Sequence, residues 1–355
     1  MRSQFAGAAR RFGPLLLLLL PLALTACNPD DPQNTFTANG FVAKEQAELF
    51  WVTFWLMVAV FVLVQGLLLI ALIKFRHRPN QPEPRPIHGN TRFEIGWTIL
   101  PTLILVGIGV PSVQKLFELD QPPSQPLTIE VVGHQWWWEF RYHTDWPDAN
   151  ENAVGQQYGI QNFTTATDLH IPVGVPIKVY LHSADVQHSF WIPRLAGKTD
   201  LIPPRVNHMW FNADTPGVYS AQCAELCGIQ HAQMRFYVYA QSDADFRAWV
   251  QAQQVVPTTP TTGPAADGSQ LIITGGCIAC HTIEGTAARG QIGPNLTHVA
   301  SRGALAGGIL PNTPENISRW LHDPQAVKQG NHMELPRPLT DEEINDLVAY
   351  LETLR

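Results

Sequence analysis

The chain has 355 residues, enough for two or more domains, and its 45% hydrophobic content fits a globular or a partly membrane-embedded protein. The formal net charge is −7, with acidic residues in excess over 120–250 and over 265–355. An acidic surface steers basic protein partners and argues against nucleic acid as a partner.

The first 26 residues are typical of an export signal. Arg2, Arg10 and Arg11 precede a short apolar core. That core ends in Leu-Thr-Ala-Cys at 24–27, which resembles the lipobox of bacterial lipoproteins. A lipoprotein signal would leave Cys27 as an acylated first residue at the membrane surface, followed by an exported segment to residue 48. The alternative is an ordinary secretory signal in which the cysteine is incidental.

Two apolar runs, 49–73 and 95–117, are each long enough to cross a bilayer. Two such runs so close together disfavour the alternative, buried helices of a soluble protein. The segment 74–94 between them carries five basic residues against two acidic ones. The positive-inside rule places this loop in the cytoplasm. We therefore predict a two-helix transmembrane hairpin in the bacterial inner (plasma) membrane, with the N-terminus and the C-terminal domains outside, on the periplasmic side.

Strand-like sequences follow the second apolar run. The segments 128–132, 177–181 and 236–239 are rich in β-branched or aromatic residues, with Pro and Gly between them. Strands recurring in this way predict a small Greek-key β-sandwich or barrel over 118–252.

A Pro/Thr-rich segment, 253–266, cannot pack a core and predicts a semi-rigid tether. The remaining residues, 267–355, form a third unit. Its end, 341–351, has acidic residues in the first turn and apolar residues at helical spacing, which predicts a helix.

The third unit begins with a motif of c-type haem attachment. Cys277, Cys280 and His281 form C-x-x-C-H, in which two thiols bond the porphyrin and the histidine ligates the iron. The alternative is a disulfide beside an incidental histidine. Met333 is the only methionine after the motif, and Met/His ligation is typical of cytochromes c. We predict Met333 as the sixth ligand, with His332 as its rival.

A second group of metal ligands lies in the strand-rich part. One short loop holds Cys223, Cys227, His231 and Met234, and His188 lies upstream. A mononuclear blue copper site needs one cysteine, so this loop has enough sulfur to bridge two copper ions. The alternatives are a disulfide or a zinc site.

The Cys-x3-Cys-x3-His-x2-Met loop, with the upstream Asp-Val-x-His-Ser, resembles the dinuclear copper (CuA) site of cytochrome c oxidase subunit II. The resemblance covers about 43–250 and includes Gly-His-Gln-Trp-Trp-Trp at 133–138 and Glu-Ile-Gly-Trp-Thr-Ile-Leu-Pro at 94–101. It implies a cupredoxin-like sandwich whose copper ligands are His188, Cys223, the backbone carbonyl of Glu225, Cys227, His231 and Met234. The appended haem motif makes the caa-type oxidases the nearest match, and implies an all-α cytochrome c domain.

The resemblance also implies roles for residues outside the copper ligands. Trp136 resembles the surface aromatic through which electrons enter; the alternative is that it packs the sandwich. Glu94 resembles the acid at the mouth of a proton path; the alternative is a charge that ends a membrane span. The side chain of Glu225 matches a position that binds magnesium shared with subunit I. We expect His182 and His208 to be ordinary surface or strand histidines.

We therefore expect a membrane-anchored multidomain protein, subunit II of a proton-pumping cytochrome-c oxidase. The resemblance implies a relay from a cytochrome c, or another respiratory complex, through haem c and CuA to subunit I, which holds haem a and copper. Subunit III and membrane lipid are the other implied partners. Two spans argue against the soluble nitrous-oxide reductase, the haem motif against a copper chaperone, and the intact copper ligands against a quinol oxidase.

Overall fold

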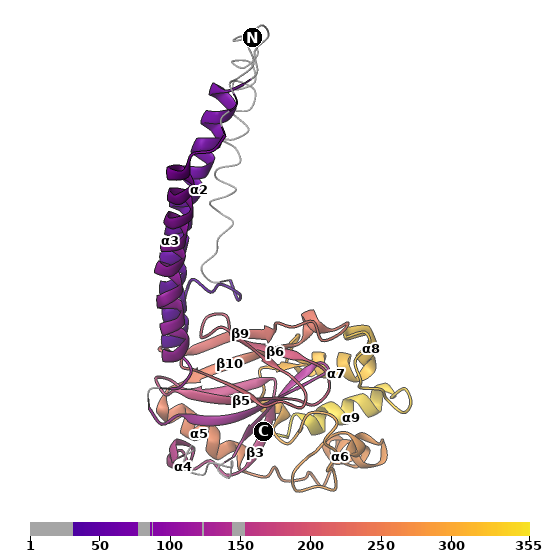
Figure 1. Cartoon of the computed structure of the whole chain (residues 1–355). Coiled ribbons are helices and arrows are strands. Elements are labelled where there is room, and N and C mark those ends of the chain that lie inside the picture. Colours follow the sequence, from indigo (N-terminus) through magenta and orange to yellow (C-terminus); the bar gives the residue numbers. More distant parts are fainter. Residues whose placement is uncertain (1–30, 77–85, 87, 123, 144–152) are drawn as a thin grey trace, which may run out of the picture.

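The computed structural model describes residues 31–76, 86, 88–122, 124–143 and 153–355. Two long helices stand at one end of a β-sandwich, and a small helical unit packs against the other end (Figure 1). The export signal, Cys27 and the basic stretch 77–85 lie outside the described residues.

The long helices are α2, Phe41–Lys74, and α3, Thr91–Glu118. Both are long and apolar enough to cross a membrane, and their large apolar side chains are exposed along most of their length. The side chain of Asn90 caps α3 by accepting the backbone N–H of Arg92 at 3.1 Å. The helix then runs unbroken through its two prolines. Apolar surface of this extent is suited to lipid, where a helix satisfies its own backbone groups.

The first long helix begins at Phe41 and not at residue 49, where the apolar run starts. Its first turns pack on the sandwich: Val42 and Ala43 are buried, and the backbone N–H of Phe41 donates to Asn212 Oδ1 at 2.8 Å. A β-carbon at Gly40 would lie 2.2 Å from the Asn212 carbonyl oxygen. Hydropathy marks only the part of a helix that is suited to lipid, so the run did not include these turns.

The sandwich has two five-stranded sheets, ordered β3-β2-β1-β5-β8 and β4-β10-β9-β6-β7. β1 lies parallel to β5 and β4 parallel to β10, and the other strand pairs are antiparallel. The strands are β1 Leu127–His134, β2 Trp137–Tyr142, β3 Phe163–Ala166, β4 Asp168–Pro172, β5 Ile177–Ser183, β6 His188–Trp191, β7 Lys198–Leu201, β8 Asn207–Phe211, β9 Gly217–Cys223 and β10 Arg235–Gln241. The three strand-like segments of the sequence lie within β1, β5 and β10.

Aromatic side chains fill the space between the two sheets. Trp138 and Phe140 of the first sheet meet Phe190 and Phe236 of the second, with ring centroids 5.3–5.6 Å apart. All four are fully buried, so this packing fixes the strands that carry the predicted copper ligands. Two helices, α4 Ala153–Gln157 and α5 Asp243–Gln253, flank the sandwich.

The C-terminal unit is mainly helical. Its helices are α6 Pro264–Thr274, α7 Pro314–His322, α8 Pro324–Val327 and α9 Asp341–Leu351, with short 3-10 turns at Cys277–Ala279 and Val299–Ser301 and two short strands, β11 Ala304–Leu305 and β12 Leu310–Pro311. Helices α6 and α9 cross in close contact, because a β-carbon at Gly268 would lie 2.0 Å from the Asp346 carbonyl oxygen. Helix α9 begins with a capping box between Thr340 and Glu343, where the acidic first turn predicted its start.

The C-terminal unit contacts the sandwich through hydrogen bonds of its own backbone groups. The backbone N–H of Gly303 donates to Asp168 Oδ2 at 2.6 Å, and that of Arg235 donates to the Gly307 carbonyl at 2.9 Å. These bonds join the loop that carries β11 and β12 to strands β4 and β10. The two units are therefore docked, although residues 254–263 between α5 and α6 form no helix or strand.

Candidate metal centres

The sulfur-rich loop joins β9 to β10 and lies over the start of β6. Cys223 ends β9, and Met234 precedes β10. Residue Phe190 of β6 pairs with Cys223, which brings His188 of the same strand towards the loop. Antiparallel pairing thus gathers residues that lie more than thirty positions apart in the sequence.

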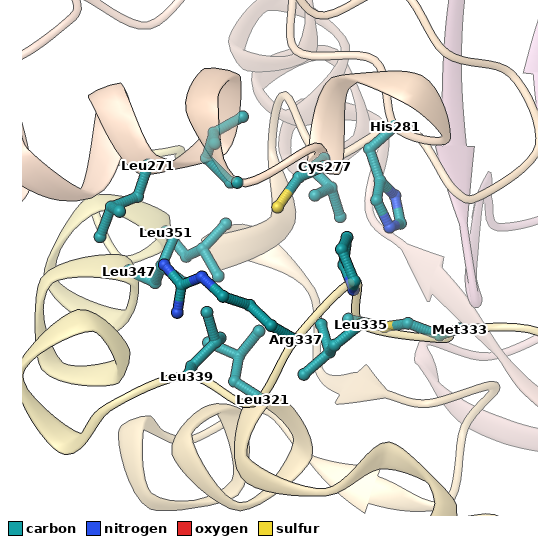
Figure 2. Close-up of a pocket in the computed structure, with 14 residues that line it drawn as sticks. Leu271, Cys277, His281, Leu321, Met333, Leu335, Arg337, Leu339, Leu347 and Leu351 are labelled. Atoms are coloured by element: carbon teal, nitrogen blue, oxygen red, sulfur yellow. The ribbon is translucent and has the colours of Figure 1, made fainter.

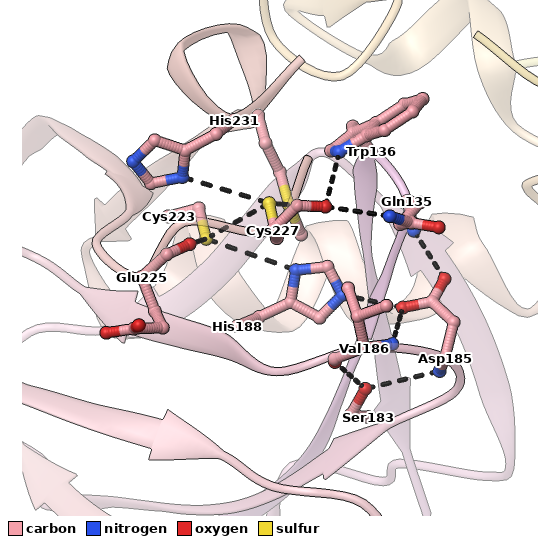
Figure 3. Close-up of polar contacts among 11 residues, drawn as sticks. Gln135, Trp136, Ser183, Asp185, Val186, His188, Cys223, Glu225, Cys227 and His231 are labelled. Carbon is pink, nitrogen blue, oxygen red and sulfur yellow. Dashed lines mark hydrogen bonds and ion pairs between the residues drawn. The ribbon is translucent and has the colours of Figure 1, made fainter. Parts of the chain in front are cut away.

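Six donor atoms converge in this loop (Figure 3). Cys223 Sγ lies 3.8 Å from Cys227 Sγ, 4.0 Å from His188 Nδ1 and 3.2 Å from the carbonyl oxygen of Glu225. Cys227 Sγ lies 3.8 Å from both His231 Nδ1 and Met234 Sδ. The sulfurs are too far apart for a disulfide, whose S–S bond is about 2.05 Å.

The residues of this cluster fit a copper pair. His188, Cys223, Cys227 and Met234 are buried, so the site is shielded from water. Two thiols, two imidazoles and a thioether are soft or intermediate donors of the kind that copper prefers. The Glu225 carboxylate points away from the sulfurs, and only its carbonyl faces them (Figure 3). Hydrogen bonding between the two thiols lowers the pKa of Cys223 and raises that of Cys227, so Cys223 is the cysteine that more readily gives a metal-binding thiolate.

Three residues outside the ligand set orient it. Asp185 Oδ1 lies 2.7 Å from His188 Nε2, which leaves Nδ1 facing the sulfur. Its other oxygen, Oδ2, accepts the backbone N–H of Gln135 at 2.7 Å. The side chains of Gln135 and Trp136 both donate to the Cys227 carbonyl, at 2.7 and 3.0 Å. Sequence reasoning assigned no role to Asp185 or Gln135, although both lie inside the motifs that carried the resemblance.

Trp136 lies in the turn between β1 and β2, and only 7% of it is exposed. This differs from the expected surface aromatic, because the C-terminal unit covers it: the His332 ring lies 5.2 Å away, centroid to centroid.

Two other groups of candidates lie apart from the copper cluster. Glu94 sits in the first turn of α3, at the end of the helix far from the sandwich (Figure 1). His182 and His208 face Glu130 and Asp120, at 3.5 and 3.9 Å.

A pocket of about 620 Å³, counted with the open space at its mouth, lies in the C-terminal unit. Cys277, His281 and Met333 line one side, and leucines of α6 and α9 line another (Figure 2). Both cysteines of the C-x-x-C-H motif are free thiols. An apolar pocket with the Cys277 thiol and the His281 imidazole in its wall fits a covalently attached haem.

The loop at 293–296 orients the histidine of this pocket. His281 Nδ1 bonds the carbonyl oxygen of Pro294 at 2.8 Å, which leaves Nε2 for an iron ligand bond. A β-carbon at Gly293 would lie 2.6 Å from His281 Cε1, so only glycine allows this approach.

The two rival sixth ligands point to different places. Met333 lines the pocket, and its sulfur accepts the indole N–H of Trp320 at 3.1 Å. His332 does not line that pocket and contacts Trp136 instead.

Three family models match successive parts of the chain. They are cytochrome c oxidase subunit II, transmembrane domain, at 34–115; its periplasmic domain at 127–241; and cytochrome c at 265–355. With the two apolar helices, these matches give a membrane-anchored chain whose sandwich lies on the outer side.

Similar proteins share nearly the whole length of the chain. Cytochrome c oxidase subunit 2 of Alkalihalophilus pseudofirmus is 36% identical over 98% of this chain and 97% of its own. The proteins of the same name from Bacillus sp. (strain PS3) and Bacillus subtilis are 34% and 31% identical, over 79% and 96% of this chain and 80% and 97% of their own. The chain therefore belongs to the cytochrome c oxidase subunit II family, as a member with a C-terminal cytochrome c domain.

Proposed function

We propose that this chain relays electrons from a cytochrome c donor through its haem c and CuA to the haems of subunit I, where oxygen is reduced to water and protons are pumped. Its family makes it a subunit of a haem–copper oxidase complex, which implies a subunit I partner, and its domains imply CuA copper and haem c. The observation that carries this proposal is the docking of the haem unit on the copper loop: the Gln230 side chain bonds the Gln329 carbonyl across the contact.

The proposal gives each ligand a role. Cys277 and Cys280 would bond the porphyrin, with His281 and Met333 as the axial ligands. The copper pair would take the six donors described above, from His188, Cys223, Glu225, Cys227, His231 and Met234. When bound, both groups supply reversible one-electron chemistry. The chain contributes ligands held on fixed strands and by bonded partners such as Asp185, which limits their movement between oxidation states.

The remaining partners and the location belong to the same proposal. The oxidase would lie in a bacterial plasma membrane, with this chain spanning it twice and both ends outside, beside subunit III. Cys27 would add a lipid anchor after removal of residues 1–26. The Glu225 carboxylate, which faces away from the sulfurs, would bind magnesium together with subunit I (Figure 3).

Replacing Glu94 tests the proposed proton path. The residue sits exposed at the inner end of α3, where a carboxylate can take protons from the cytoplasm. Glu94→Ala should slow steady-state oxygen consumption about 100-fold or more, because a positioned proton-transfer group contributes roughly 10²–10⁴-fold. Reduction of copper by the donor should stay at the wild-type rate, because Glu94 lies at the far end of α3. Glu118→Ala, at the outer end of the same helix, is the control. Unchanged oxygen consumption in Glu94→Ala would make Glu94 a helix-end charge only.

Replacing Trp136 tests the electron path. Trp136→Phe removes the N–H that donates to the Cys227 carbonyl but keeps an aromatic ring. The copper spectrum should stay intact while transfer from haem c to copper slows about tenfold, equal to a barrier higher by about 1.4 kcal/mol. Flash photoreduction of the haem measures this rate. Trp137→Phe is the matched control, because that ring stacks on His134 instead. A wild-type rate in Trp136→Phe would mean that Trp136 only packs the contact.

A further inference from the structure

The contact between the haem unit and the sandwich centres on Trp136. Its indole N–H bonds the Cys227 carbonyl at 3.0 Å on the copper side. A β-carbon at Gly228 would lie 2.8 Å from the indole ring, so the copper loop lies directly against it. On the other side, the His332 imidazole lies 5.2 Å from the indole, centroid to centroid, with the rings tilted by 53°.

His332 also directly precedes Met333, the residue that lines the haem pocket. The haem pocket is therefore joined to the copper loop in three steps. Met333 is bonded to His332 along the chain, and the His332 ring contacts Trp136. The indole N–H of Trp136 then donates to the carbonyl of Cys227. The sequence presented His332 only as a rival ligand, but its ring contacts Trp136 and does not line the haem pocket.

A buried lysine fixes the position of the haem unit on the sandwich at this contact. Lys328 is 3% exposed, and its ammonium donates to the carbonyls of Trp136, Gln233 and Ala306 at 2.7, 2.9 and 2.9 Å. These carbonyls come from the β1–β2 turn, the copper loop and the haem unit. Burial lowers the pKa of Lys328 to about 7, and three carbonyl acceptors match the three N–H donors of the protonated group. A β-carbon at Gly307 would lie 2.6 Å from both Lys328 Nζ and the Trp136 carbonyl oxygen, so the packing here is close.

We propose that His332 is the bridge by which electrons leave the haem unit for Trp136 and the copper pair, with Lys328 as the positioning residue that holds the bridge closed. This deepens the proposed relay and rests on it. Haem c, held by Cys277, Cys280 and His281, would supply one electron in each event and the copper pair would take it up; no bond would break and no proton would move. Neither ring needs to be oxidised, because the step uses the contact and not a chemical change of the side chain.

The test compares two replacements of the ring in the intact oxidase. His332→Gln removes the aromatic contact, whereas His332→Phe keeps it. Transfer from haem c to copper after flash photoreduction should slow about tenfold in His332→Gln and stay within about twofold of wild type in His332→Phe. Both variants should keep the wild-type haem and copper spectra and the wild-type haem–copper distance measured by pulsed electron paramagnetic resonance.

Lys328→Met tests the positioning role, with Lys198→Met, at the exposed first residue of β7, as the control. Loss of the ammonium should lengthen the haem–copper distance or broaden its distribution. It should also slow transfer from haem c to copper by about tenfold or more, since small misplacements are costly. The control should match wild type in both measurements.

A wild-type transfer rate in His332→Gln would overturn the bridge. Equal slowing in both His332 variants, together with a longer haem–copper distance, would overturn it as well. An unchanged distance in Lys328→Met would overturn the positioning role. These results differ from failure of the relay itself, in which wild-type haem c would not reduce the copper at all.

Discussion

Cys227→Ser should abolish the copper centre and with it the relay. Cys227 Sγ lies within 3.8 Å of Cys223 Sγ, His231 Nδ1 and Met234 Sδ, so it faces three other members of the donor set. Serine has nearly the same shape, but its hydroxyl is a harder donor that copper does not prefer. Since loss of an outer-shell partner alone typically costs 10–100-fold, loss of this bridge should lower oxygen consumption at least about 100-fold.

The measurement is the copper content of the purified complex per covalent haem c, together with its visible spectrum. Leu226→Ala is the matched control, because Leu226 lies between the two cysteines but is 77% exposed. The control should keep full copper and the wild-type spectrum. Wild-type copper content in Cys227→Ser would contradict a shared thiolate site.

Met333→His should lower the reduction potential of the haem. A thioether stabilises ferrous iron better than a second imidazole does, so the shift should be on the order of 0.1 V, within the roughly 0.8 V that axial ligands span. At 59 mV per tenfold for one electron, this changes the equilibrium with the donor by about 50-fold. Electron flow towards copper should stall at its first step, because the donor no longer reduces the haem.

Met333→Ala should instead leave an open position that binds added imidazole or cyanide. The wild-type oxidised domain should show the weak long-wavelength sulfur-to-iron charge-transfer band, and Met333→His should lose it. A low-spin haem without that band in the wild type would assign the sixth ligand to His332. That result would also remove His332 from the contact with Trp136.

Local patterns in the sequence predicted the elements that depend on neighbouring residues. The C-x-x-C-H motif and the Cys-x3-Cys-x3-His-x2-Met loop specify ligands by spacing, and the described structure brings these side chains together. The acidic first turn predicted the start of α9 at Asp341. β-Branched and aromatic residues predicted segments that lie in β1, β5 and β10.

Features that depend on packing between distant segments were not predictable in this way. The first turns of α2 pack on Asn212, about 170 positions away, and no hydropathy pattern marks such a contact. Trp136 is covered because the C-terminal unit docks on it, whereas the resemblance implied a surface aromatic. Lys328 reads as an ordinary surface lysine until the three carbonyls from separate segments are seen around it.

The order of reduction in the intact oxidase tests the central claim most directly. The oxidised complex, with its oxygen site inhibited, is mixed with a reduced cytochrome c in a stopped-flow instrument. The absorbances of haem c and copper are then followed in time. The relay predicts that haem c is reduced first and that copper follows at the rate measured after flash photoreduction of haem c. Reduction of copper before haem c would contradict the relay. So would copper reduction at the wild-type rate in Met333→His, in which the donor no longer reduces haem c.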